Sequence, residues 1–417
     1  MPLDRRGFLV RSGLALAAAG VFGPEALVGA AETNTKTAPS WRAVRRQFLL
    51  RRDRVHLGGF LLASHPTPVR QAIERHRRRF DADPVDYLHR NYMAEEAAVL
   101  GLAAAYTGGR GEDIALTDST TMGLSLLYNG IELGAGDDVL TSTHDFFVTH
   151  EALRLKAEQT GASVRKIQLY EEAANASADE IVRRVAAAVM PRTRVVALTW
   201  VHSSTGVKLP IRRIADALAP LNGGSILMCV DGVHGFGVED VRLPELGCHF
   251  FVAGCHKWLF GPRGTGIVWG RPEAWPRVRT TIPSFTETGT PGSRMTPGGF
   301  HSFEHRWALA DAFRFQLRIG KARVAARTHA LNTRFKSGLA AMSHVTCHTP
   351  RSTDLSSGLV CFEVRGRAPE DVVDYLSQHD VIATVTPYVP SYARVSPSIL
   401  NTPAEIDRTL GLLRKLA

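Results

Sequence analysis

The sequence has little cysteine, few aromatic residues and no uninterrupted apolar run long enough to cross a bilayer. Five cysteines among 417 residues are an odd count in a long chain, which argues against a disulfide framework. Aromatic residues make up 8% of the chain, and the basic runs at residues 42–54 and 75–79 mostly lack the interleaved aromatic residues that a nucleic-acid groove needs. The net charge of +10 therefore indicates solvated helix faces that attract carboxylate-bearing substrates, and we expect no nucleic-acid partner.

The first thirty residues differ from the rest and predict a signal peptide. An Arg5-Arg6 pair is followed by an apolar stretch over residues 14–22 and by small residues up to Ala30. This order is typical of an export signal, and the paired arginines resemble the twin-arginine type. We expect a periplasmic protein without an integral membrane segment once residues 1–30 are removed. A Sec-type signal, or a cytoplasmic N-terminus with chance arginines, is the alternative.

Short apolar runs alternate with helical patterns through the middle of the chain. The apolar runs lie at residues 114–117, 139–141, 166–169, 195–200, 226–230, 250–253 and 267–269. Segments with helical spacing lie between most of them, at residues 122–133, 147–159, 178–189 and 211–218. This alternation predicts an α/β fold with a central, mostly parallel sheet flanked by helices. A ligand should then bind at the carboxyl ends of the strands.

The remaining segments predict the domain organisation. A long helical pattern runs from Arg306 through Ile319 toward Leu339, and a smaller α+β unit follows it. We expect a tether and N-terminal helix over residues 31–54, a large cofactor-binding domain over 55–320, and a small C-terminal domain over 321–417.

Two residues at predicted strand ends carry the chemistry. Lys257 follows the apolar run 250–253 and precedes a Gly-Pro turn, where burial would lower the pKa of its amine and make it nucleophilic toward an aldehyde. Asp231 ends the run 226–230, where a carboxylate could keep the ring nitrogen of a pyridoxal cofactor protonated. Lys257 could instead be a surface lysine and Asp231 a turn aspartate, but the occurrence of both residues in one chain favours a cofactor site. Thr120 and Thr121 lie between an apolar run and a helix, where hydroxyl and amide groups bind phosphate unless they only cap the helix.

These segments together resemble the class V aminotransferase superfamily of fold-type-I pyridoxal-phosphate (PLP) enzymes. The resemblance rests on the Ser/Thr turn, the Val-Asp-Gly-Val-His segment, the His-Lys-Trp…Gly-Pro segment and the closing Arg-Val-Ser…Asn-Thr-Pro-Ala-Glu-Ile-Asp, at residues 117–121, 230–234, 256–264 and 394–407. It extends from about residue 55 to the C-terminus and is nearest to the isopenicillin-N-epimerase-like branch, which is related to cysteine desulfurases. It implies a homodimer with sites at the subunit interface.

The resemblance also implies a role for each matching residue. Lys257 would hold PLP as an internal aldimine and move protons, and Asp231 would pair with the pyridinium nitrogen. The other implied cofactor contacts are His234 to the phenolic oxygen, Thr120, Thr121 and His256 to the phosphate, and His144 stacked on the ring. Arg394 would bind the substrate carboxylate, a task suited to a guanidinium group.

Some positions depart from the family pattern. Ser203 stands where relatives often have an asparagine near the ring, and Gly254 stands where desulfurases have a phosphate-binding serine. Ser302 would replace the Gly-Thr of the partner subunit that caps the phosphate. No cysteine lies between Cys361 and Arg394, which argues against sulfur abstraction from cysteine.

We considered three alternatives to a PLP enzyme. Zinc on Cys248, His249, Cys255 and His256 is disfavoured because adjacent strand residues point to opposite faces, and we expect no metal. The glycine clusters at residues 235–237 and 261–266 lack the dinucleotide-binding context. A PLP-fold protein that only binds remains a third possibility.

We therefore expect an exported PLP enzyme that acts on a primary amine of an amino acid or of a peptide-borne residue. Transamination, epimerisation, elimination and an oxidative variant all remain open, and cysteine desulfurase or lyase activity is the alternative. Exported relatives, as in pyoverdine maturation, tailor a peptide siderophore, which is a hypothesis for this chain as well.

Overall fold

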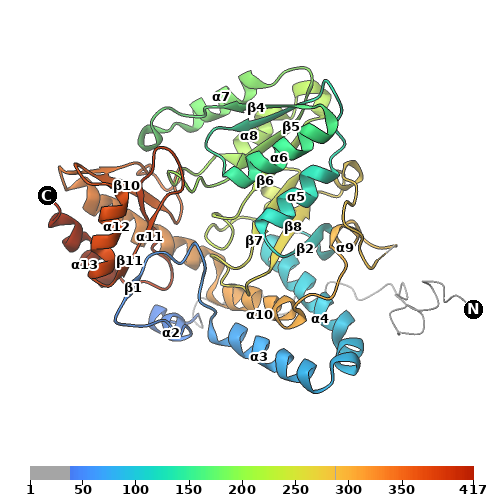
Figure 1. The fold of residues 1–417 in the computed structure, drawn as a ribbon, viewed down its shortest axis with the longest axis horizontal. Coiled ribbons are helices and arrows are strands. Elements are labelled where there is room, and N and C mark those ends of the chain that lie inside the picture. The colour runs from blue at the N-terminus through green and yellow to red at the C-terminus, as the bar shows by residue number, and fades with distance from the viewer. Residues whose placement is uncertain (1–37, 287) are drawn as a thin grey trace, which may run out of the picture.

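The computed structural model describes residues 38–286 and 288–417 as a helix-covered sheet joined to a smaller C-terminal unit (Figure 1). The predicted signal peptide at residues 1–30 lies outside the described residues, so it stays a prediction. Among the described residues, no helix combines the length and the apolar character needed to cross a membrane.

Seven strands form the central sheet in the order β2-β8-β7-β6-β5-β3-β4. Their bounds are β2 (Ile114–Thr117), β3 (Asp138–Ser142), β4 (Ser163–Ile167), β5 (Thr193–Thr199), β6 (Leu227–Asp231), β7 (Phe250–Gly254) and β8 (Gly266–Gly270). All pairs are parallel except those of β8, which runs antiparallel to β2 and β7. The loop after β7 returns directly into β8, and a connection without a crossover helix joins antiparallel strands. The predicted fold class is confirmed.

Helices pack on both faces of this sheet (Figure 1). One face packs against α5 (Thr120–Gly130), α6 (Phe147–Thr160) and α9 (Pro291–Met295). The other face packs against α3 (Thr67–Ala82), α4 (Pro84–Thr107), α7 (Ala178–Ala188), α8 (Ile211–Leu218) and α10 (Phe303–Ile319). Alternate residues of one strand enter different cores: Val196 and Leu198 face one layer, while Val195 and Ala197 face the other. This two-sided burial explains the continuous apolar runs in the sequence.

The C-terminal unit has its own sheet and core. Its four strands are antiparallel, in the order β12 (Thr384–Val385), β13 (Ala393–Val395), β10 (Val360–Val364) and β9 (Val345–Cys347). Three helices accompany them: α11 (Lys321–Ala340), α12 (Pro369–Gln378) and α13 (Pro403–Arg414). The long helical pattern predicted from Arg306 toward Leu339 is two helices, because Gly320 adopts φ 92° between α10 and α11.

The N-terminal segment contributes to this same unit. After the short helix α2 (Trp41–Arg46), β1 (Val55–His56) pairs in parallel with β11 (Val381–Ile382). Leu57 is fully buried in the C-terminal core, and its carbonyl accepts hydrogen bonds from the backbone N–H and hydroxyl of Ser396. Residues 55–57 therefore belong to the small unit, although they precede every strand of the large sheet in the sequence.

Candidate active site

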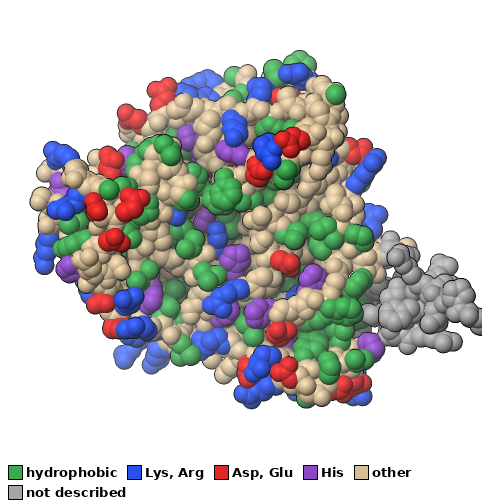
Figure 2. Space-filling model, viewed as in Figure 1, with side chains coloured by type: hydrophobic (Ala, Val, Ile, Leu, Met, Phe, Trp, Pro, Cys, Tyr) green, Lys and Arg blue, Asp and Glu red, His purple; other side chains and the backbone are tan. Residues whose placement is uncertain are grey.

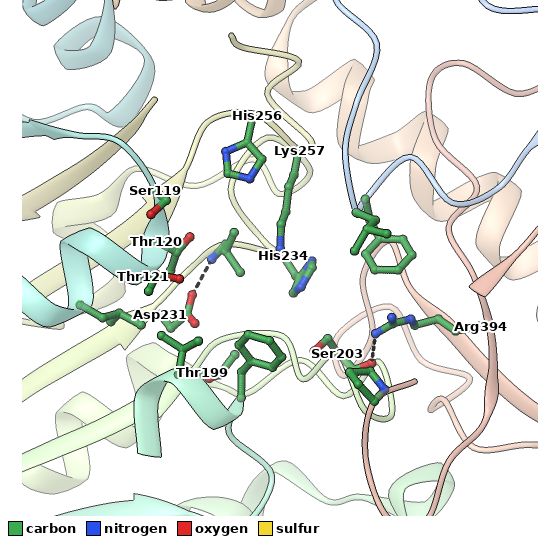
Figure 3. Close-up of a pocket in the computed structure, with 17 residues that line it drawn as sticks. Ser119, Thr120, Thr121, Thr199, Ser203, Asp231, His234, His256, Lys257 and Arg394 are labelled. Carbon is green, nitrogen blue, oxygen red and sulfur yellow. Dashed lines mark hydrogen bonds between the residues drawn. The ribbon is translucent and has the colours of Figure 1, made fainter. Parts of the chain in front are cut away.

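A cavity of about 190 Å³ lies where three neighbouring strands, β5, β6 and β7, end (Figure 3). It brings together most of the residues predicted from the sequence, namely Thr120, Thr121, Ser203, Asp231, His234, His256, Lys257 and Arg394. The large sheet and its loops supply all of them except Arg394, which comes from β13 of the C-terminal unit. The cavity therefore lies between the two units of the chain.

Asp231 is the last residue of β6 and is buried at the base of the cavity. One carboxylate oxygen, Oδ1, accepts a hydrogen bond of 3.0 Å from the backbone N–H of Val233. Burial raises the pKa of the Asp231 carboxyl to about 6, although the Val233 N–H and the charge of Lys257 oppose the shift. A cationic ring nitrogen placed beside this carboxylate would relieve the cost of burying its charge.

Lys257 follows β7 and extends into the cavity toward His234 (Figure 3). The pKa of its amine is lowered to about 8, chiefly by burial; the charge of Asp231 opposes the shift, and the charge of Arg394 adds to it. An amine with this pKa is partly neutral near physiological pH, which a nucleophile requires.

The pKa of Lys257 predicts how fast apoprotein captures PLP. The rate of covalent loading should rise about tenfold between pH 7 and pH 9, because the neutral fraction of an amine with a pKa near 8 rises by that factor. Stopped-flow absorbance would measure this rate. Each value is divided by the rate for a simple alkylamine of ordinary pKa, whose neutral fraction rises more steeply over the same range, so the normalised rate should fall as the pH rises. A normalised rate that does not depend on pH would show that Lys257 has no lowered pKa.

The N-terminus of α5 forms a polar turn against the end of β7. The Ser119 side chain caps the helix by accepting from the N–H of Met122 at 3.1 Å, and the Thr120 hydroxyl accepts from the N–H of Gly254 at 2.8 Å. The first N–H groups of a helix have no acceptor within the helix, so this turn offers donors to an anion. At Gly254, an added Cβ would lie 2.9 Å from the His256 ring and 3.1 Å from the Thr120 hydroxyl, so a serine there would force its neighbours to shift.

Two histidines complete the wall of the cavity. The Nδ1 atom of His234 accepts a hydrogen bond of 3.3 Å from the indole N–H of Trp258, and burial holds the pKa of His234 well below its usual value. Its other ring nitrogen is thereby left for a ligand. Burial also lowers the pKa of His256, whose Nδ1 is buried and has no partner among the described residues.

The chemistry of the lining residues fits PLP. A buried acid, a lysine of lowered pKa and a helix N-terminus with hydroxyl groups surround one cavity, matching a pyridine nitrogen, an aldehyde and a phosphate. Two buried polar atoms that line it, Nδ1 of His256 and Oγ1 of Thr199, lack partners among the described residues. Buried polar atoms are rarely left unpaired, so these two are available to a bound group.

Arg394 lies on the opposite side of the cavity from Asp231 (Figure 3). Its guanidinium packs over the Phe60 ring at 4.3 Å and donates from Nη1 to the Ser203 carbonyl at 2.6 Å. The side chain is buried, yet no carboxylate of the described residues pairs with it. A ligand carboxylate would supply that missing charge.

The structure does not bring His144 into the cavity. The His144 ring stacks on Tyr170 at 3.9 Å, and its Nε2 accepts from the N–H of Leu169. The next residue, Asp145, is anchored to the backbone N–H groups of Ser142 and Thr199. This anchored turn points the following residue, Phe146, into the cavity instead, and Phe146 is one of its lining residues.

Ser302 is also absent from this cavity. It lies at the start of α10, where its hydroxyl donates to Glu304 at 2.7 Å, and it lines a second cavity together with Asp118, Arg263 and His301. Its predicted role required it to act from a partner subunit, and that role stays a prediction.

Sequence reasoning missed several residues of the site. Thr199 ends β5 directly beside Asp231. The expectation that a ligand binds at the carboxyl ends of the strands, which identified Asp231, would also have identified Thr199. Phe60, Phe146 and Tyr388 come from loops, and only the folded chain brings them to the cavity or its edge.

Comparisons with known proteins identify the family. Residues 90–408 match the family model for aminotransferase class V. The isopenicillin N epimerase of Streptomyces clavuligerus is 26% identical over 395 residues, covering 90% of this chain and 98% of the relative. A cysteine desulfurase of Klebsiella pneumoniae is 24% identical over 347 residues, covering 78% of this chain and 82% of the relative.

A solved structure has the same fold. It is a C-DES variant with glycine covalently linked to its PLP cofactor, with a TM-score of 0.82 and 19% identity, covering 89% of this chain and 98% of that one. The family model spans most of this chain, and its match includes the strand ends and the lysine loop that form the cavity. The chain belongs to the class V aminotransferase family, and its cofactor is pyridoxal phosphate.

Proposed function

We propose that this enzyme holds PLP through the amine of Lys257 and acts on an amine whose carbon also bears a carboxylate. The observation that carries the proposal is the position of Arg394, a buried cation without a protein carboxylate, across the cavity from Asp231. The substrate is a free α-amino acid or a peptide-borne residue that retains both groups.

Each residue of the cavity would contribute one physical step. PLP, when bound, supplies a ring that accepts the electron pair left when a bond to the amine-bearing carbon breaks. Asp231 would keep the ring nitrogen protonated, His234 would contact the phenolic oxygen, and the α5 turn with His256 would hold the phosphate. Lys257 moves a proton at the amine-bearing carbon, and the same step serves transamination, epimerisation, elimination and an oxidative variant.

Two aminooxy probes test carboxylate recognition without knowledge of the natural substrate. Aminooxyacetate carries a carboxylate and O-methylhydroxylamine does not, and both react with covalently held PLP. Replacing Arg394 with alanine should slow aminooxyacetate about a hundredfold, because two charge-assisted hydrogen bonds are lost, while O-methylhydroxylamine should react within about twofold of wild type. Arg351→Ala, which changes an exposed arginine outside the cavity, is the control. Equal slowing of both probes would contradict carboxylate binding by Arg394.

Cysteine desulfurase activity is the alternative function, and the thiols disfavour it. No cysteine lines the cavity that holds Lys257 among the described residues. Cys361 lies inside β10, where burial raises the pKa of its thiol to about 12, so it is a poor nucleophile at neutral pH. Sulfide release from cysteine by the purified enzyme would reverse this preference.

Homodimerisation is supported by exposed apolar side chains near Ser302. Phe300 is 77% exposed and Phe285 is 49% exposed, and their rings lie 5.8 Å apart. Exposed apolar side chains that lie against one another would lose contact with water in a subunit interface. A dimer built on this surface would place Ser302 close to the subunit interface, and a monomer in sedimentation would contradict it.

Export is proposed from the sequence of residues 1–30 alone. A twin-arginine route suits a protein that must bind PLP in the cytoplasm before it crosses the membrane. The tailoring of a siderophore peptide extends this proposal. Recovery of the protein from the cytoplasm alone would contradict export, and unchanged siderophores after gene deletion would contradict the tailoring role.

A further inference from the structure

The cavity edge opposite Asp231 contains a contact that the roles above do not use. The Tyr388 hydroxyl lies 2.6 Å from the hydroxyl of Ser203, and Tyr388 belongs to the turn between β12 and β13. Ser203 belongs to the loop after β5. The contact therefore joins the C-terminal unit to a loop of the large sheet beside the cavity, which Ser203 lines.

Ser203 makes two hydrogen bonds with the same hairpin. Its hydroxyl pairs with Tyr388, and its carbonyl accepts from Nη1 of Arg394 at 2.6 Å. The other contacts of the guanidinium are longer, at 3.3 Å from Nε to the Thr384 hydroxyl and 3.5 Å from Nη2 to the Val385 carbonyl. The Ser203 carbonyl is thus the shortest contact that orients the guanidinium.

The turn that carries Tyr388 is itself well fixed. The N–H of Thr386 donates to the carbonyl of Tyr392 at 2.9 Å, and the N–H of Tyr392 donates to the Thr386 hydroxyl at 2.9 Å. The Tyr388 ring packs against Phe146, a lining residue of the cavity, with ring centroids 6.2 Å apart. Burial raises the pKa of the Tyr388 phenol to about 12, so it stays protonated and able to hydrogen-bond at physiological pH.

We propose that Tyr388 is a positioning residue for carboxylate recognition. By holding the Ser203 hydroxyl, it fixes the carbonyl that orients Arg394, and so it sets the preference of the cavity for amines that bear an adjacent carboxylate. This inference rests on the proposed function of Arg394. It assigns to Tyr388 and Ser203 a joint role that neither would perform alone.

The test compares the two aminooxy probes on PLP-loaded enzyme. Tyr388→Phe removes only the hydroxyl, so the ratio of the rate constants for aminooxyacetate and O-methylhydroxylamine should fall about three- to tenfold, as expected for one lost hydrogen bond. The rate for O-methylhydroxylamine alone should stay within about twofold of wild type. Tyr392→Phe is the matched control, because Tyr392 stacks on His348 outside the cavity and should retain the wild-type ratio.

A double-mutant cycle separates this role from general damage. Ser203→Ala should lower the ratio by a similar factor, and Tyr388→Phe combined with Ser203→Ala should lower it no further than either change alone. A wild-type ratio in Tyr388→Phe, equal slowing of both probes, or additive effects would each overturn the inference. If the wild-type enzyme reacts with both probes at the same rate, the proposed carboxylate site is wrong instead. If it reacts with neither, the proposed PLP chemistry is wrong.

Discussion

Replacing Lys257 with alanine should abolish covalent attachment of PLP and slow amine turnover by roughly a hundred- to ten-thousandfold. No other lysine lines the cavity among the described residues, so no neighbour is placed to take over either task. The absorbance spectrum would lose the band of covalently held cofactor. Borohydride reduction followed by peptide mass analysis would find the cofactor on Lys257 in the wild-type enzyme and on no lysine in the variant.

Lys166→Ala provides a control for this experiment. Lys166 is exposed on the edge strand β4 and does not line the cavity. The control should retain both the spectrum and the turnover. Recovery of a reduced cofactor adduct from the Lys257→Ala protein would refute the assignment of this lysine.

Replacing Asp231 with asparagine should leave PLP attached but slow turnover about a hundredfold or more, because a strong charged contact with the ring nitrogen is lost. Asparagine has nearly the same shape, so the effect reports on charge. Absorbance at several pH values would show whether the ring nitrogen loses its proton. Asp216→Asn changes an exposed aspartate on α8 and serves as the control.

The raised pKa of Asp231 also predicts how the same substitution changes the free energy of unfolding of the apoprotein. The folded-state pKa of Asp231, about 6, is raised above its usual value, so the native state binds more protons than the unfolded state between about pH 4 and pH 6. Wild-type stability therefore falls as the pH rises through this window. At pH 7 apo Asp231→Asn should be more stable by about 3 kcal/mol, and the difference should nearly vanish by pH 4. Urea unfolding would measure it, and an equal difference at both pH values would contradict the raised pKa.

The fully buried strands were the most predictable part of the fold. The run at residues 114–117 coincides with β2, and the amphipathic segment at 211–218 coincides with α8. Strand β4 was predicted too late, at 166–169, because it is an edge strand with polar residues such as Arg165, which pairs with Asp138. An edge strand packs less apolar surface and gives a weaker pattern.

The site was predictable where a strand end fixed the residue. Asp231 and Lys257 follow buried strands, and the fold confirms that both line one cavity. The structure places His144 outside the cavity, because the direction of a side chain in a turn depends on anchors far along the chain, here the bond between Asp145 and the N–H of Thr199. Tyr388 was not predicted, because the residues next to it in the sequence give no indication of a contact with Ser203, which is distant in sequence.

The pairing of β1 with β11 means that the C-terminal unit is not a contiguous piece of the polypeptide. Its core includes Val55 and Leu57, and the His56 carbonyl accepts from the side-chain amide of Asn401. A chimera that exchanged only residues after 320 between relatives would leave one protein's first strand docked on the other protein's framework. Evolution of the Arg394 side of the cavity is therefore tied to a stretch of chain near the opposite end of the gene.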